Sequence, residues 1–184
     1  DQTFDNLIAT PDNFSKGEYD TCVFKNCEFG NFNLSGFEFV DCEFIGCNLT
    51  MANLAKTAFK TAKFKECKLL GVHFEVCNPF LLSLDFEGCM LNLSCFFKLN
   101  LKNSRFDHCS MQEVDFSDAN LSGCSFDNSN LLNTTFVNTN LEKADFRLAE
   151  NFHIDPEMNR VKKAKFSNSG LIGLLGKYDI VVKI

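Results

Sequence analysis

The 184-residue sequence contains no tryptophan, only two tyrosines and three prolines, and no long apolar run. Since no apolar segment approaches the ~20 residues that cross a bilayer, we expect no contact with a membrane. No charged start followed by an apolar signal segment is visible, and a removed leader stays an open alternative because the chain begins with Asp1 rather than Met. With 24 acidic and 18 basic residues the net charge is −6, which argues against direct binding of nucleic acid.

The short motifs that accompany catalysis and metal binding are also absent. No two cysteines have the C-x-x-C spacing of a zinc site, and no glycine-rich phosphate-binding loop is present. The three histidines, His73, His108 and His153, are scattered, and their spacing does not group them with a nucleophile. We therefore predict no catalytic residue, no metal ligand and no cofactor, and we rank an enzyme behind two non-catalytic functions.

Phenylalanine, by contrast, is abundant at 22 residues, and it follows a five-residue repeat. The segment ANLSGCSFDNSNL (119–131) places Leu121, Phe126 and Leu131 five apart, which fits neither the helical period of 3.6 nor the strand period of 2. The same frame runs over residues 14–74 and 86–146, and Phe or Leu occupies nearly every centre. A short repeat sustained over this length is typical of a solenoid.

A small residue stands two positions before most centres, so both point to one face of an extended segment. Asn, Asp, Ser, Thr and Gly lie between these pairs and favour tight turns. Four such corners return the chain above its start after about 20 residues, with right-handed winding as the expected hand. We therefore predict that residues 20 apart stack on one another, for example Phe106 and Phe126.

The quintets ANLSG, CSFDN, SNLLN, TNLEK and ADFRL resemble the A(D/N)LXX motif of the pentapeptide-repeat family over about residues 14–148. The resemblance implies an all-β fold, a right-handed quadrilateral β-helix, but it does not imply one function. Within this fold we expect an N-terminal cap (1–13), a first stack of coils (14–74), a phase-slip segment (75–85), a second stack (86–148) and a C-terminal segment (149–184).

The frame is interrupted once, because Phe74 and Phe86 lie 12 residues apart. We interpret the segment EVCNPFLLSLD (75–85) as a kink between the two stacks. The alternative is a protruding recognition loop, in which Phe80, Leu81 and Leu82 would meet a partner. The N-terminal segment fits the frame poorly, and we expect it to cover the open strand edge of the first coil.

Beyond residue 149, IDPEMN predicts a helix start with Asp155 as its cap and Pro156 in its first turn. The frame then returns through Phe166 and Leu171, and LIGLLGKYDIVVKI predicts a short apolar helix followed by a strand from Ile180. This ending is similar to the helix and strand with which quinolone-resistance (Qnr) pentapeptide proteins form tail-to-tail dimers. The resemblance implies a homodimer, and a simple terminal cap is the alternative. The candidate dimer residues are Leu171, Leu174, Leu175, Ile180 and Val182.

Nine of the ten cysteines fall two positions before a frame position, and Cys95 is the exception. We interpret the nine as small buried apolar side chains, because parallel side chains hold Cβ atoms farther apart than the ~3.8 Å that a disulfide prefers. So many unpaired thiols favour a reducing compartment, and we expect the protein to be cytoplasmic.

Charge is the remaining feature, since residues 86–146 carry eight acids and four bases whereas residues 14–74 carry seven of each. The resemblance to Qnr and mycobacterial fluoroquinolone-resistance proteins implies an acidic rod that mimics DNA and engages DNA gyrase. We therefore expect a protein partner, with a gyrase or topoisomerase modulator as the sharpest hypothesis. A scaffold for an unrelated protein is the alternative. The carboxylates that would replace phosphates are Glu87, Asp107, Asp127, Asp115 and Asp118.

Overall fold

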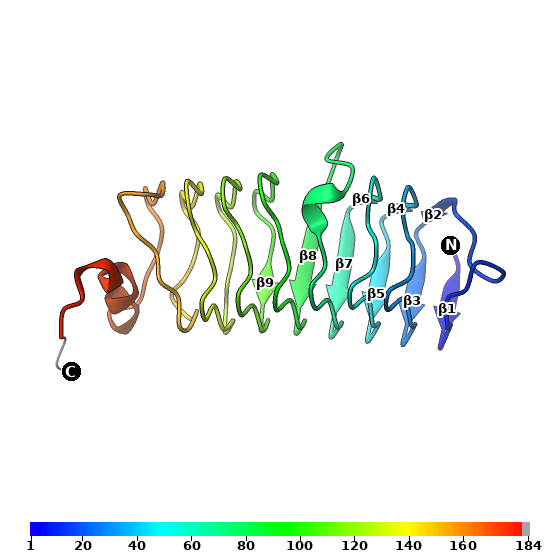
Figure 1. The fold of residues 1–184 in the computed structure, drawn as a ribbon, viewed down its shortest axis with the longest axis horizontal. Helices are drawn as coiled ribbons and strands as arrows, with labels where there is room; N and C mark the ends of the chain where they lie inside the picture. Colours follow the sequence, from blue (N-terminus) through cyan, green and yellow to red (C-terminus); the bar gives the residue numbers. More distant parts are fainter. Residues whose placement is uncertain (182–184) are drawn as a thin grey trace.

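The computed structural model describes residues 1–181 as a column of stacked coils (Figure 1). Isolated β-bridges pair residues in parallel from Ile8 with Glu28 near one end to Asp145 with Lys165 near the other. The paired residues are 20 apart except at Lys68–Met90 and His73–Cys95, where they are 22 apart. Because the sequence repeat is five residues long, a register of 20 gives each coil four sides. The predicted fold class, a quadrilateral β-helix of the pentapeptide-repeat type, is confirmed.

Two sides of the column carry regular strands. One side holds a six-stranded parallel sheet in the order β1-β3-β5-β7-β8-β9, and another holds a three-stranded sheet in the order β2-β4-β6. Each strand is short because a corner follows within the same quintet. The strands are β1 Thr3–Asp5, β2 Glu18–Asp20, β3 Val23–Lys25, β4 Glu38–Val40, β5 Glu43–Ile45, β6 Ala58–Lys60, β7 Ala62–Lys65, β8 Leu84–Glu87 and β9 Phe106–Asp107.

Helical structure within residues 1–181 is confined to three short 3₁₀ segments, η1 Phe74–Val76, η2 Ser169–Leu174 and η3 Gly176–Tyr178. In this part of the chain, no helix has the length and hydropathy of a membrane span.

The corners turn through residues in the left-handed backbone conformation, two positions after a frame centre. Asn26 has a φ of 51°, Asn31 of 56° and Asn128 of 55°. Asn and Asp adopt this conformation more readily than other side chains. The abundance of these residues between the Phe and Leu centres is therefore explained by the geometry of the corner.

The large side chains stack in columns inside the coil. Phe24, Phe44 and Phe64 follow one another with ring centroids 4.8 Å apart at each step. Phe106 and Phe126 lie 5.3 Å apart with an interplanar angle of 5°, and both are fully buried. The predicted 20-residue stacking is thus confirmed, and these rings are committed to the core.

The small residue that points inward two positions before a frame centre also makes hydrogen bonds. Thr57 Oγ1 donates a hydrogen bond to the Leu34 carbonyl oxygen at 2.7 Å, and Cys47 Sγ donates to that of Phe24 at 3.3 Å. Donor and acceptor are 23 residues apart in both cases, so the contact joins one coil to the coil before it. The interpretation of the cysteines as purely apolar was therefore incomplete: a thiol or hydroxyl at this position ties neighbouring coils together.

All ten cysteines are unpaired. Burial raises the pKa of Cys42 to about 11 and that of Cys124 to about 12. The Cys42 and Cys124 thiols are therefore neutral at pH 7.

The two-residue slip forms a protruding loop rather than a kink. Ala58 pairs with Asn78, 20 residues on, whereas Phe64 pairs with Phe86, 22 residues on. The extra residues are absorbed between Asn78 and Leu84, where the chain leaves the column after η1 (Figure 1, green). The column itself continues, because β7 pairs directly with β8. We call residues 79–83 the loop.

The N-terminal segment belongs to the frame, contrary to prediction. Phe4 stacks on Phe24 with centroids 4.9 Å apart, and β1 pairs with β3. Ala9 occupies the next frame position and is partly buried against the core. Ala9 is too small to be recognised as a frame centre from the sequence. Because Phe4 and Ala9 both follow the frame, the segment builds part of the first coil.

The predicted helix at IDPEMN does not form. The Asp155 carboxylate accepts the N–H of Glu157 at 2.9 Å, and the Met158 N–H donates to the Asp155 carbonyl at 3.2 Å. These bonds close a single turn. Asp155 therefore caps a turn instead of starting a helix.

The last segment also departs from prediction. Phe166 does regain the column, 5.4 Å above Phe146, but Leu171 is 47% exposed and lies outside it. The expected apolar helix is replaced by η2 and η3, and Ile180 is not in a strand. Gly173 packs so closely on Phe152 that a Cβ would collide with its backbone, and glycine also weakens α-helix formation.

Candidate functional site

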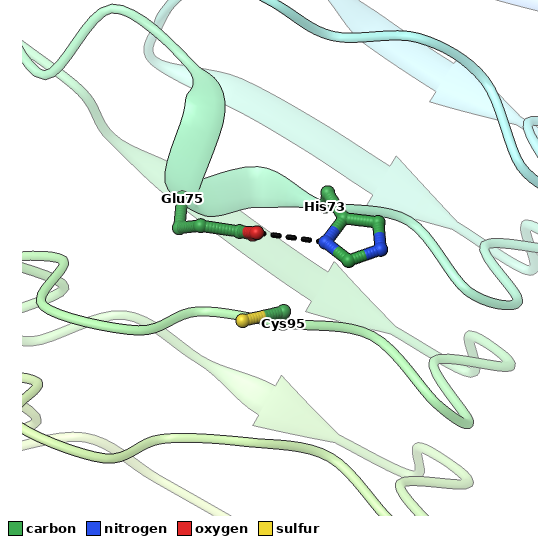
Figure 2. Close-up of side chains that lie close together, drawn as sticks. All are labelled: His73, Glu75 and Cys95. Atoms are coloured by element: carbon green, nitrogen blue, oxygen red, sulfur yellow. Dashed lines mark hydrogen bonds and ion pairs between the residues drawn. The ribbon is translucent and has the colours of Figure 1, made fainter.

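A histidine, a glutamate and a cysteine meet on the flank of the column beside the loop (Figure 2). His73 Nδ1 lies 2.7 Å from Glu75 Oε1, and Cys95 of the next coil pairs with His73 in parallel register. One potential ligand atom from each of the three residues lies within 4.8 Å of the others. His73 therefore lies beside a cysteine, a neighbour that the sequence spacing did not indicate.

The slip in the repeat creates this cluster. His73 and Cys95 each stand directly before a frame centre, and those centres, Phe74 and Phe96, stack at 4.6 Å. A residue next to a centre points outward along an extended segment. With a uniform register of 20, His73 would lie beside Leu93, and the two extra residues replace that leucine by Cys95.

One carboxylate oxygen of Glu75, Oε2, has no hydrogen-bond partner in the described part of the chain. The Glu75 side chain is 22% exposed, and Oε2 is buried. Among residues 1–181, this oxygen is the only buried side-chain oxygen or nitrogen without a hydrogen-bond partner. Leaving such a group unpaired costs ~1–3 kcal/mol, and more when it is charged. A cation placed beside Glu75 would remove that cost.

The Cys95 thiol is not prepared for nucleophilic attack. Burial, together with the negative charges of Glu75 and Asp115, raises the pKa of Cys95 to about 11. A catalytic cysteine needs a lowered pKa, because the thiolate is the nucleophile. His73 is also 63% exposed, so the histidine–glutamate pair is open to water rather than enclosed. The chemistry that suits the cluster is metal binding, in which a cation displaces the thiol proton.

The loop is the second candidate. The Phe80 N–H donates to the Asn78 side-chain oxygen at 3.0 Å, and Leu81 takes the left-handed conformation at φ 57°, which closes a tight turn. Phe80 and Leu81 are 65% and 63% exposed, whereas Leu82 is partly buried against the core. The turn thus exposes Phe80 and Leu81 to water, while Leu82 packs against the core.

The candidate carboxylates do not form one surface. Glu87 and Asp107 are partners on the six-stranded side, with Asp127 one coil further, whereas Asp115 follows Cys95 on another side. Asp107 is only 7% exposed. Its carboxylate accepts hydrogen bonds from Arg105 Nη2 at 2.6 Å and Ser125 Oγ at 2.7 Å. The Asp107 carboxylate is therefore bonded to side chains of the fold, whereas DNA mimicry requires a carboxylate that is open to a partner.

Basic neighbours interrupt the acidic column further. Glu87 pairs with Lys65 at 3.3 Å. In the adjacent row, Arg147 at 2.8 Å and Lys165 at 3.2 Å flank Asp145. The Arg147 guanidinium holds the pKa of Asp145 down to about 2. Positive and negative side chains thus alternate along this side, unlike the unbroken charge of a phosphate backbone.

Three carboxylates of the set, Asp115, Asp118 and Asp127, are in no ion pair among the described residues, and Asp127 is half-buried. Asp118 is exposed at a corner with φ 58°, and Asp115 is half-buried and accepts the Ser117 N–H at 2.8 Å.

The predicted dimer residues are spread over the C-terminal segment. Leu171 and Ile180 are 47% and 54% exposed, and Leu174 and Leu175 are half-buried. Val182 lies outside the described residues. The homodimer stays a prediction.

Comparisons with known proteins agree with the geometry of the coil. A family model for the pentapeptide repeat region matches residues 18–96 and 99–174. A trypsin-treated form of QnrB1, a plasmid-mediated fluoroquinolone resistance protein, is a similar solved structure, with a TM-score of 0.66, 18% identity, and coverage of 99% of this chain and 95% of that chain. HetL, a pentapeptide repeat protein involved in heterocyst differentiation regulation from the cyanobacterium Nostoc sp. Strain PCC 7120, gives a TM-score of 0.42 and 14% identity over 91% and 84% of the two chains. No curated protein matches the chain in sequence.

Proposed function

This chain belongs to the pentapeptide-repeat family, and from that premise we propose that it is a non-catalytic, protein-binding solenoid whose partner docks on the loop at residues 79–83. One observation carries the proposal: Phe80 and Leu81 are 65% and 63% exposed at the point where the chain leaves the column. Large apolar side chains that lie next to each other at the surface mark contact surfaces more often than isolated ones do.

The loop is already ordered, so binding a partner would cost little conformational entropy. Its turn is closed by Asn78 and anchored by Leu82, so little freedom is lost when Phe80 enters a partner's pocket. An aromatic side chain that becomes fully buried at an interface contributes ~2 kcal/mol or more. The expected partner surface is an apolar cleft wide enough for one aromatic and one aliphatic side chain.

Differential affinity capture tests the loop. The wild-type chain, the double variant Phe80→Ser/Leu81→Ser and the control Leu148→Ser are immobilised in parallel. The control removes an exposed leucine (55%) far from the loop. A specific partner remains on the wild type and the control, and its affinity for the double variant falls at least tenfold. Equal retention on all three would remove the loop as the docking site.

DNA gyrase or a topoisomerase is the most specific candidate partner, because QnrB1 is a fluoroquinolone resistance protein of similar fold. Mimicry of B-DNA calls for about one negative charge per 1.7 Å. The net charge of −6 and the pairing of Glu87 and Asp107 within the fold favour the loop over a phosphate-like surface. Asp118 and Asp127 are the acids that would remain for mimicry.

A gyrase supercoiling assay with quinolone separates these contacts. If the wild type protects supercoiling and Phe80→Ser/Leu81→Ser does not, gyrase is the partner and the loop contacts it. If only Asp118→Lys/Asp127→Lys abolishes protection, these two carboxylates make the contact. Absence of any effect from micromolar wild-type protein would remove gyrase. It would leave the scaffold for an unrelated protein, identified by the capture experiment.

We also propose a reducing location, the cytoplasm, since ten unpaired thiols support it.

A further inference from the structure

We propose that His73, Glu75 and Cys95 form a binding site for a divalent transition-metal ion, with Zn²⁺ as the ion of matching chemistry. The site lies at the base of the loop, and the bound ion would hold that base in place. The second part rests on the proposed function, whereas the metal site itself does not.

The donor set selects the class of ion. Imidazole nitrogen, thiolate sulfur and carboxylate oxygen are the three ligand types that Zn²⁺ accepts in proteins. Ca²⁺ and Mg²⁺ prefer oxygen ligands throughout, so a set with one sulfur and one nitrogen disfavours them. Three protein ligands leave the fourth position of a tetrahedral ion to water. The exposure of His73, 63%, leaves room for that water.

The geometry needs only small side-chain movements. Zinc–ligand bonds of about 2.0–2.3 Å place the ligand atoms of a tetrahedral site roughly 3–4 Å apart, and here they already lie within 4.8 Å of one another. His73 and Cys95 are register partners on adjacent coils, which fixes the distance between their backbones. Glu75 offers one carboxylate oxygen within this distance, and its Oε2 is buried without a hydrogen-bond partner among the described residues.

The local charge also favours a cation. Glu75 stands beside Cys95, and Asp115 follows Cys95 in register on the next coil. The Asp115 carboxylate already accepts the Ser117 N–H at 2.8 Å, so it supplies negative potential rather than a free ligand. A divalent ion would balance these charges.

The position of Glu75 connects the ion to the loop. Glu75 lies in η1, and Cys77 and Asn78 lead directly from this turn into the loop. An ion that joins Glu75 to Cys95 therefore fastens η1 to the following coil. Because a ligand that binds only the folded arrangement stabilises it, the loop base gains order when the ion binds.

Titration of the full chain, without a histidine tag and with thiols reduced, tests the site. Calorimetry with Zn²⁺ should give one ion per chain, and Co²⁺ should show a thiolate-to-metal charge-transfer band. Cys95→Ser should abolish the band, and both Cys95→Ser and His73→Asn should weaken Zn²⁺ binding at least tenfold. His108→Asn is the matched control, because it removes an exposed histidine from a left-handed corner that asparagine tolerates. It should bind like the wild type.

Three results would overturn the metal site: no Zn²⁺ binding by the wild type, Co²⁺ binding without a thiolate band, or an undiminished band in Cys95→Ser, which would assign the ion to other thiols. The loop variant Phe80→Ser/Leu81→Ser should bind Zn²⁺ like the wild type, so failure of the loop proposal and failure of the metal site are distinguishable. Partner retention that is unchanged by a chelator would overturn the coupling of the ion to the loop.

Discussion

The regular coils at residues 96–146 and the interrupted stretch at 73–95 share one core but differ in what they present outward. In the regular coils, outward asparagines bond to one another: Asn120 Nδ2 donates to Asn100 Oδ1 at 2.8 Å, and Asn140 Nδ2 donates to Asn120 Oδ1 at 3.1 Å. Such ladders tie the coils together. There, most side chains that follow the repeat serve the fold.

The interrupted stretch places different chemistry in the same outward positions. His73 and Cys95 stand where the regular coils mostly carry asparagine, serine, threonine or aspartate, and the loop extends from the column nearby. None of these side chains is needed to stack the Phe columns, which pass straight through at 5.3 Å between Phe64 and Phe86. In this chain, the break in the repeat therefore carries side chains that the stacking of the coils does not require.

The largest expected effect comes from the regular core. Phe116→Ala removes a fully buried ring that stacks on Phe96 at 5.0 Å, and it should lower the free energy of unfolding by ~3–5 kcal/mol. Phe80→Ala, at an exposed position, should change it by no more than ~0.5 kcal/mol. Urea denaturation of both variants measures the difference. Similar losses would contradict the division between core and loop.

An inward hydroxyl tests the hydrogen bonds between coils. Thr134 Oγ1 donates to the Met111 carbonyl at 2.6 Å and is buried. Thr134→Val keeps the shape but loses the donor, and should cost ~1 kcal/mol of unfolding free energy. The neighbouring Thr135→Val, at an exposed position, is the control. Equal effects of the two changes would mean that the inward bond adds no stability.

Acid should weaken the charged side through Asp145. Its folded pKa of about 2 lies below the value of ~3.9 expected when unfolded, so its ion pair stabilises the fold above pH ~4 and this stability is lost as pH falls toward 2. Asp145→Asn should cost about 1 kcal/mol at pH 7, after allowance for solvent screening, and progressively less as pH falls through 2. Thermal melts across this range check it. A difference that does not depend on pH would refute the ion pair as its source.

The smallest effect is expected from restoring the uniform register. Deletion of Phe80 and Leu81 returns the chain to 20 residues per coil, and the unfolding free energy should change by less than ~1 kcal/mol because the loop adds little to the core. Denaturation measures the stability, and Zn²⁺ titration of the same variant should still find the site. A large loss of stability would show that the loop supports the column.

The repeat made most of the fold predictable, because each Phe or Leu centre must be buried and only one coil length stacks them. The frame over Phe4 and Ala9 was not predicted, because Ala9 is too small to be recognised as a centre. The predicted helix is replaced by η2 and η3, because Gly173 lies too close to Phe152 to allow a side chain there. The sequence does contain a feature that predicts the cluster of His73, Glu75 and Cys95. Cys95 is the one cysteine outside the inward positions, and aligning the two frames across the slip puts it beside His73. The orientation of Glu75 toward His73 could not be predicted, because it depends on the turn η1.

Hydrogen exchange of the wild-type chain with and without Zn²⁺ tests most directly whether function lies in the interrupted stretch. Added protection at residues 73–83 and around Cys95, with no change at residues 96–146 beyond that contact, is the predicted result. Unchanged exchange at residues 73–83, or protection spread evenly along the column, would show that the ion does not bind at the interrupted stretch.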